Sequence, residues 1–185
     1  MNAPTLATAW PKARYTVAQI WGLIEHDLIN ADARFELIDG EIVDMSPKGP
    51  LHEEVRQAII DWLVASVSSP LTWLPETTLY LDERAFLEPD FVIFDRSLPI
   101  RDLTANKLRL VIEVGHESWR YDTVAKAQRY AEHGVYEYWA VHAPSRLTRV
   151  HRGASATGWS EVRELAAGEA VVALCAPNAP LTLTK

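Results

Sequence analysis

The segment that most constrains the fold is KLRLVIEVG, residues 107–115. Its aliphatic and β-branched residues are apolar enough for a strand that is buried on both faces. FVIFD (91–95) precedes it as a second such run, and a helical segment from 122 to 133 follows, ended by Gly134. YEYWAVH (136–142) then alternates as a strand. The order strand, strand, helix, strand predicts a mixed α/β sheet with a helical crossover.

Glu113 is the most anomalous residue of this apolar strand. A charged carboxylate is costly to bury unless it is paired or coordinates a metal ion. Asp90, directly after Pro89, stands at the start of the neighbouring strand and supplies a second carboxylate. Mg²⁺ commonly takes one or two protein carboxylates together with waters and substrate phosphate. The backbone carbonyl of Val114 is expected to lie close to the same ion.

Lys126 follows Glu113 on the next predicted helix. Asp122 and Tyr130 stand four residues before and after it, so the three side chains share one helix face. A long lysine side chain from that face can reach back over the strand end where Glu113 lies. There its charge would stabilise the transition state of phosphodiester hydrolysis. The alternative is a surface Asp–Lys pair, which contributes only a few tenths of a kcal/mol.

The flanking segments predict additional elements around this core. Thr16 and Gln19 have the spacing of a capping box at the start of a helix within residues 15–29. Asp39-Gly40 between two alternating runs predicts a hairpin. Further elements are expected as a helix from Leu51 to about Val67 and as strands at 76–81, 146–152, 158–165 and 170–174. No linker divides the sequence, so we expect one domain over residues 1–185.

The composition excludes several classes of protein. The single cysteine, Cys175, rules out an internal disulfide framework and a cysteine-based zinc cluster, and it is consistent with a reducing cytoplasm. No stretch approaches the roughly 20 apolar residues that cross a bilayer, and the first residues lack the features of a signal peptide. We therefore expect a cytoplasmic protein with no membrane partner. Motifs of P-loop proteins, α/β-hydrolases and zinc proteases are missing from the sequence.

The charge distribution is uneven. The whole chain carries a net charge of −7, which argues against a general coat of nucleic acid. Residues 96–152 hold ten Lys and Arg against six Asp and Glu, a local balance of +4. This contrast is compatible with a cationic face around a phosphate site, and equally with ordinary surface variation.

Four segments stand in the order of a known family: FELIDGEIVDMSP, then His52, then EPDFVIFD, then LVIEVGHESWRYDTVAKAQRYAEHGVYEYWAV. Together they resemble the Uma-type family of restriction-endonuclease-like proteins, within the PD-(D/E)XK nuclease superfamily. The resemblance implies a mixed β-sheet core at about residues 35–142, flanked by helices. An N-terminal helix, a hairpin and extra C-terminal strands surround that core.

The resemblance also implies roles for individual residues. Asp90 and Glu113 become the catalytic acids and metal ligands. Two residues after Glu113, where the superfamily motif has lysine, this chain has Gly115. The lysine function is therefore assigned to Lys126 on the following helix, and Asp122 would orient it. Accessory roles are expected for Asp122 and Tyr130. Apart from the resemblance, Arg120 and Arg129 either contact the nucleic-acid backbone or are solvated surface charges.

Each of two further accessory candidates has more than one possible role. Glu36 is a third acidic group near the metal ion, reached through water, or a half-exposed strand residue, or a partner of Arg34. His52 contacts phosphate, shuttles a proton, or caps the helix at whose start it stands. Tyr138 and Trp139 are expected to pack in or beside the sheet rather than to stack on bases.

The expected activity is that of a Mg²⁺- or Mn²⁺-dependent endonuclease acting on DNA. A homodimer is expected because enzymes that cut both strands often pair two active sites. One alternative is a nuclease-fold module that no longer cleaves and binds nucleic acid or a protein partner. Another is an enzyme that acts on RNA or a nucleotide, since a fold does not fix a function.

Overall fold

The computed structural model describes residues 13–185, so residues 1–12, which bear on the signal-peptide expectation, lie outside it. The chain forms two compact units. The first holds the described residues up to Met45 together with Asp82–Phe86, and the second holds Ser46–Leu81 and Leu87–Lys185. No helix within residues 13–185 is long and apolar enough to cross a membrane.

The first unit contains the predicted helix and hairpin. Helix α1 (Val17–Glu25) begins at the capping box of Thr16 and Gln19, as predicted. Strands β1 (Phe35–Ile38) and β2 (Glu41–Asp44) pair antiparallel. Asp39 and Gly40 between them both have positive φ, which a tight two-residue turn requires. The small core of this unit consists of Ile20, Phe35, Leu37 and Phe86.

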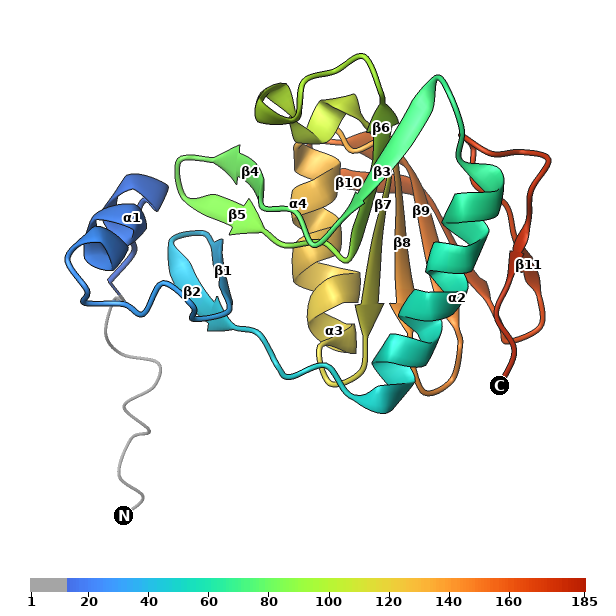
Figure 1. Ribbon diagram of the computed structural model, residues 1–185, viewed down its shortest axis with the longest axis horizontal. Helices are drawn as coiled ribbons and strands as arrows, with labels where there is room; N and C mark the ends of the chain where they lie inside the picture. Colours follow the sequence, from blue (N-terminus) through green and yellow to red (C-terminus); the bar gives the residue numbers. More distant parts are fainter. Residues whose placement is uncertain (1–12) are drawn as a thin grey trace. The chain divides into compact units, whose positions relative to one another are not determined.

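The second unit is built on a six-stranded sheet of order β10-β9-β8-β7-β6-β3 (Figure 1). Its strands are β3 (Leu71–Pro75), β6 (Phe91–Asp95), β7 (Leu108–Gly115), β8 (Glu137–His142), β9 (Thr148–Ser155) and β10 (Gly158–Leu165). Its helical segments include α2 (Pro50–Ser66), the single turn α3 (Trp119–Tyr121), the π-helical turn η4 (Asp122–Lys126) and α4 (Ala127–Glu132).

The direction of the strands confirms the predicted mixed sheet. β6 and β7 pair antiparallel, whereas β7 and β8 pair parallel. The parallel pair is joined through α3, η4 and α4, which is the expected helical crossover. The fold class predicted from the sequence is therefore correct.

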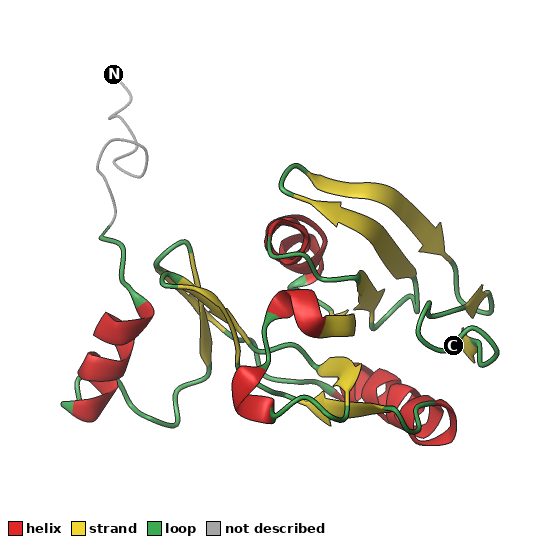
Figure 2. Cartoon of the chain, turned by 90° about the horizontal axis from the view of Figure 1, so that it is seen from above, coloured by secondary structure: helices red, strands yellow, loops and turns green. Residues whose placement is uncertain are grey.

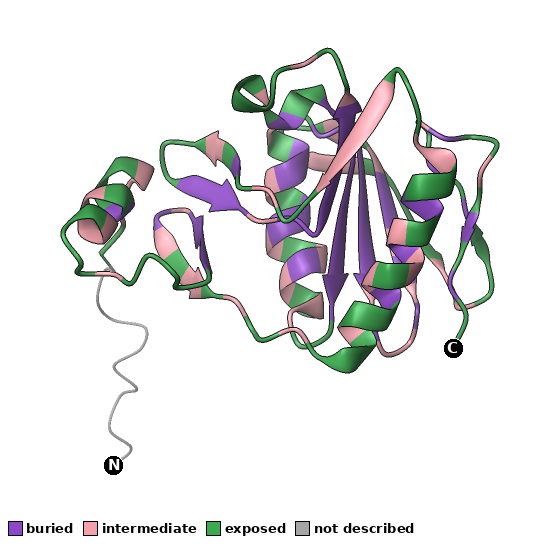
Figure 3. Cartoon of the chain, in the orientation of Figure 1, coloured by how far each residue is buried: buried purple, intermediate pink, exposed green. Residues whose placement is uncertain are grey.

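Alternation along β7 divides the sheet into two faces. Leu110, Ile112 and Val114 belong to the main core, to which α2 contributes Val55, Ile59, Trp62 and Leu63. Glu113 points to the opposite face, toward α4. Figure 2 shows α2 and α4 on opposite sides of the central strands. Those central strands are buried along most of their length (Figure 3), so a carboxylate within β7 is shielded from solvent on both sides.

Several elements differ from the sequence predictions. β3 was not predicted, and the strand expected at 76–81 is β4 (Leu79–Asp82), because Glu76 adopts a left-handed φ of 45° that ends the extended backbone. The hairpin partner of β4 is β5 (Ala85–Leu87). The strand expected at 170–174 shortens to β11 (Ala170–Val171), paired with β12 (Leu181–Thr182). Short 3₁₀ turns η2 (Ile100–Asp102) and η3 (Ala105–Lys107) precede β7.

Candidate active site

Glu113 and Lys126 form an ion pair inside the second unit. The Lys126 Nζ donates to Glu113 Oε1 at 3.0 Å, and Tyr130 OH donates to the same oxygen at 2.7 Å. The side chains of Glu113 and Lys126 are 5% and 6% exposed. The alternative of a surface Asp–Lys pair is therefore wrong, since Lys126 reaches back onto the strand. Two hydrogen bonds from the helix compensate the cost of burying the Glu113 charge.

Asp122 lies on the other side of the Lys126 amine. Its Oδ1 is 3.7 Å from Lys126 Nζ, and its Oδ2 accepts a hydrogen bond from Ser118 Oγ at 2.7 Å. Ser118 stands at the start of α3 but makes no capping hydrogen bond with its side chain. Asp122 is itself buried. Lys126 thus lies between two carboxylates, which fix its charge and its direction.

The π-helical turn η4 sets the position of this lysine. Such a turn has one more residue than an α-helical turn, and it leaves backbone groups to be bonded elsewhere. Tyr138 OH donates to the Asp122 carbonyl at 3.0 Å, and Trp159 Nε1 donates to the Ala127 carbonyl at 2.7 Å. These two aromatic residues, from β8 and β10, bracket the turn. Tyr138 therefore packs against the crossover, in agreement with the prediction that it is not a base-stacking residue.

Asp90 lies at the start of β6, beside the same end of β7. Phe91 pairs with Ile112, so the next position of this register places Asp90 opposite Glu113. Asp90 Oδ2 accepts a hydrogen bond from the Val114 backbone N–H at 2.8 Å. The Asp90 carboxylate thus lies against the backbone of the residue that follows Glu113. Nothing in the contacts of Val114 places its carbonyl at a ligand, and its role stays a prediction.

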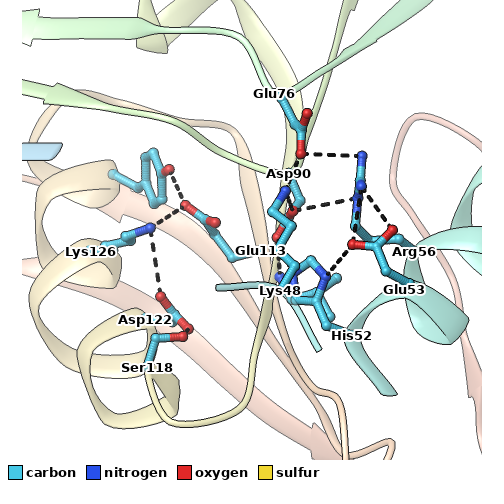
Figure 4. A network of polar contacts seen from close by, with 12 residues as sticks. Lys48, His52, Glu53, Arg56, Glu76, Asp90, Glu113, Ser118, Asp122 and Lys126 are labelled. Carbon is cyan, nitrogen blue, oxygen red and sulfur yellow. Dashed lines mark hydrogen bonds and ion pairs between the residues drawn. The ribbon is translucent and has the colours of Figure 1, made fainter. Parts of the chain in front are cut away.

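Cationic groups from α2 and the preceding loop surround Asp90 (Figure 4). Lys48 Nζ donates to Asp90 Oδ1 at 3.1 Å, and His52 Nε2 lies 3.4 Å from Oδ2. Arg56 Nε lies 3.6 Å from Oδ1. Burial by itself raises the pKa of Asp90, but the His52 hydrogen bond, the charges of Lys48 and His52 and the Val114 N–H outweigh it. Together they lower the pKa of Asp90 to about 2, so the carboxylate is ionised at neutral pH.

Lys48, Arg56 and Glu76 were not predicted from the sequence as residues of this site. Glu76 accepts a hydrogen bond from Lys48 and lies 3.5 Å from Arg56 NH2, which links these cations across the site. A signal was present: Lys48, His52 and Arg56 stand four residues apart, and the latter two occupy one face of α2. Without the position of Asp90, that spacing looks like an ordinary polar helix face.

Gly115 stands where the superfamily motif has lysine, and the packing around it leaves no room for a side chain. A Cβ at Gly115 would overlap Asp122 Oδ2 and lie 2.9 Å from Ser118 Oγ, which is also too close. Any side chain there would displace the carboxylate that holds Lys126. A lysine two residues after Glu113 is therefore incompatible with the present position of Asp122.

The donor chemistry of the site fits a hard divalent cation. Asp90 and Glu113 stand opposite each other on neighbouring strands, and two carboxylates is the number that Mg²⁺ commonly takes from a protein. Their present partners lie on different faces of the sheet, since those of Asp90 come from α2 and those of Glu113 from the crossover. No group of three or more His, Cys, Asp or Glu side chains in residues 13–185 is arranged to hold a metal ion, so a closed cage is not present there. Asp90 and Glu113 are the residues that would hold the ion, and Asp90 would first exchange its contact with Lys48.

The remaining candidates have mixed outcomes. Glu36 is buried in β1 of the first unit, so the half-exposed alternative is wrong. His52 faces Asp90, and α2 begins at Gly49 without a side-chain cap, so the capping alternative is also wrong. Arg120 is exposed, whereas Arg129 pairs with Glu132 of its own helix. Their contacts with nucleic acid, and the roles of Glu36 and His52, stay predictions.

Comparisons with known proteins agree with this architecture. A family model, Uma2, described as "Putative restriction endonuclease", matches residues 23–184. No curated protein matches the sequence. A solved structure of a "putative nuclease belonging to DUF820" from Anabaena variabilis ATCC 29413 superposes with a TM-score of 0.63 at 14% identity. The match covers 80% of this chain and 85% of that one, and it shows a shared fold.

Proposed function

The chain belongs to the Uma2 family, and we propose that it is a divalent-metal-dependent endonuclease that hydrolyses phosphodiester bonds in DNA. The observation that carries this proposal is the buried Glu113–Lys126 pair beside Asp90. Burying two charges is rarely the cheapest way to stabilise a core, because a well-packed apolar pair of equal volume is often as stable. A functional demand explains why this chain retains them.

In this proposal each side chain of the site has a separate role. Asp90 and Glu113 hold the cation, Mg²⁺ or Mn²⁺, which when bound would lower the pKa of a water molecule and offset the charge of the leaving group. Lys126 presents a fixed ammonium that stabilises negative charge developing on the scissile phosphate. Tyr130 holds the Glu113 carboxylate, and Asp122 holds Lys126 in the direction of the site. His52, on the other side of Asp90, is available to contact phosphate or move a proton.

DNA is proposed as the substrate because of the family description. A homodimer is proposed as the assembly, since a duplex offers two strands and each chain has one such site. Sedimentation or light scattering of the purified protein, with and without a DNA duplex, tests the assembly separately from the chemistry.

Incubation of supercoiled plasmid with the purified protein in Mg²⁺, Mn²⁺ or EDTA tests the activity. We expect nicked and linear products with a divalent cation and none in EDTA. Asp90→Asn should abolish cleavage, whereas Asp95→Asn at the other end of β6 should retain it, because the Asp95 carboxylate bonds only within its own turn, to Ser97. The non-cleaving module would be favoured if the protein binds plasmid, single-stranded DNA or RNA but leaves all of them intact with every cation.

A further inference from the structure

The cluster around Asp90 contains more positive charge than one carboxylate requires. Lys48 and Arg56 contribute two cations, and His52 adds a third donor when it is protonated. Their side chains are only 15%, 14% and 11% exposed. Asp90 is the one partner common to all three that is itself buried. Long basic side chains normally extend into solvent, so their convergence on one buried carboxylate indicates a specific purpose.

Arg56 is incompletely bonded in this arrangement. Its Nε is buried without a hydrogen-bond partner and lies 3.6 Å from Asp90 Oδ1. Its NH2 is 3.5 Å from Glu76 Oε1, and only NH1 donates at an ordinary distance, 3.2 Å, to Glu53 Oε2. A guanidinium has five donors in a planar fork that matches the oxygens of a phosphate. Arg56 can therefore accept a better anionic partner than those it now has.

The other anions of the cluster are easily displaced. Glu53 and Glu76 have side chains that are 51% and 44% exposed. Water can solvate each of these carboxylates once it is released, whereas the largely buried Lys48 and Arg56 need another anion in its place. An incoming anion can therefore replace these glutamates at Lys48 and Arg56 without uncovering a buried charge.

We propose that Lys48 and Arg56 form a phosphodiester-binding clamp, which Asp90 occupies until a divalent cation takes that carboxylate. The clamp rests on the proposed function, since it places a nucleic-acid backbone phosphate beside the carboxylates. A divalent cation at Asp90 repels Lys48 and Arg56 from a distance of a few ångströms. A phosphate that bonds both side chains removes this repulsion, so the cation and the phosphate bind cooperatively.

Mn²⁺ titration by calorimetry, with and without dimethyl phosphate, tests this coupling in the full chain. Dimethyl phosphate is a phosphodiester monoanion with no bases. For the wild type we expect it to tighten Mn²⁺ binding by about fivefold, a typical coupling between two sites. Lys48→Met and Arg56→Met should bind Mn²⁺ more tightly than the wild type without dimethyl phosphate, and should respond to it weakly. Lys107→Met is the matched control, because Lys107 is exposed and bonds only the Asp102 carbonyl.

The opposite directions of these changes separate a clamp from a merely structural role. A structural lysine would lower the Mn²⁺ affinity when removed, and Lys48→Gln, which keeps a hydrogen-bond donor, would restore it. Equal tightening by dimethyl phosphate in the wild type and both variants would show that the phosphate binds the metal ion alone, and would overturn the clamp. Wild type that binds Mn²⁺ with no coupling overturns the clamp but leaves the endonuclease proposal intact. Wild type that binds no Mn²⁺ overturns both.

Discussion

Lys126 Nζ lies 3.0 Å from Glu113 Oε1, thirteen residues earlier in the chain, and both side chains are buried between β7 and the helical crossover. The pair joins the most apolar strand of the sheet to the segment that follows it. Its geometry depends on three supports: the Asp122 carboxylate, the Tyr130 hydroxyl and the π-helical shape of η4. Single substitutions can perturb the pair and each of these supports separately.

Lys126→Met should destabilise the protein strongly. The substitution leaves the Glu113 charge buried without its cation, a loss that typically costs about 3–5 kcal/mol of unfolding free energy. The double variant Glu113→Gln/Lys126→Met removes both charges and should recover most of that loss. Urea denaturation of the three proteins measures this. A loss below about 1 kcal/mol in Lys126→Met, as surface pairs show, would contradict the buried arrangement.

Gly115→Ala should impair the site more than the fold. The new Cβ would meet Asp122 Oδ2 and Ser118 Oγ, so Asp122 must move and Lys126 loses its support. We expect a destabilisation of about 1–3 kcal/mol, as for overpacking, and a fall in cleavage rate of about tenfold or more. Gly22→Ala in α1, where nothing lies within 4 Å of the added Cβ, is the matched control. Unchanged cleavage by Gly115→Ala would show that Asp122 does not position Lys126.

Tyr138→Phe should remove the hydrogen bond that joins the π-helical turn η4 to β8. The hydroxyl that it removes bonds the Asp122 carbonyl, and its net contribution to stability is about 1 kcal/mol. Cleavage should fall further than this loss predicts, and separate values of kcat and KM should show that kcat falls while KM changes little. Tyr136→Phe, at a half-exposed tyrosine just before β8, should match the wild type in both stability and kcat. Equal kcat values for the two variants would contradict a positioning role for Tyr138.

The elements that the sequence predicted best are those fixed by local chemistry. The capping box of Thr16 and Gln19, the Asp39-Gly40 turn and the apolar run of β7 each follow from neighbouring residues. Glu113 was identified for the same reason, since one charge among aliphatic residues needs a partner wherever the strand lies. The helical crossover then followed from the order of the elements.

The features that the sequence did not predict depend on distant segments. Lys48 and Arg56 contact Asp90 only because the fold brings together residues more than thirty positions apart in the chain. The π-helical turn depends on Tyr138 and Trp159, which come from later strands. The left-handed φ of Glu76 lies at the first residue of the strand predicted at 76–81, and the observed strand β4 begins only at Leu79. In each case tertiary packing overrides the local preference.

Stability should fall as the pH drops below neutrality because of His151. This histidine stacks on Tyr138, and burial, together with the charge of Arg149, lowers its pKa from 6.5 to about 4 despite its backbone hydrogen bonds. The folded state therefore binds its proton less readily than the unfolded state does. The stabilisation is complete above pH 6.5 and is lost as the pH falls toward 4, by about 2 kcal/mol between pH 7 and 5.

Urea denaturation at pH 7, 6 and 5 checks the His151 prediction. His151→Phe keeps an aromatic ring and has no proton to bind, so its unfolding free energy should change less over this range. The difference between the two proteins isolates His151 from the other titrating groups, including His142. Parallel pH profiles for the wild type and His151→Phe would exclude His151 as the cause.

The most direct test of the proposed active site is the rate of single-turnover DNA cleavage in Mn²⁺ by Glu113→Gln, measured beside Glu117→Gln. Glu113→Gln keeps the shape of a buried side chain but removes the charge that pairs with Lys126, whereas Glu117 is an exposed acid four residues later. The proposed site predicts a loss of about a hundredfold or more for Glu113→Gln and a wild-type rate for Glu117→Gln. Equal cleavage by Glu113→Gln and the wild type would contradict the assignment of catalysis to Glu113, Lys126 and Asp90.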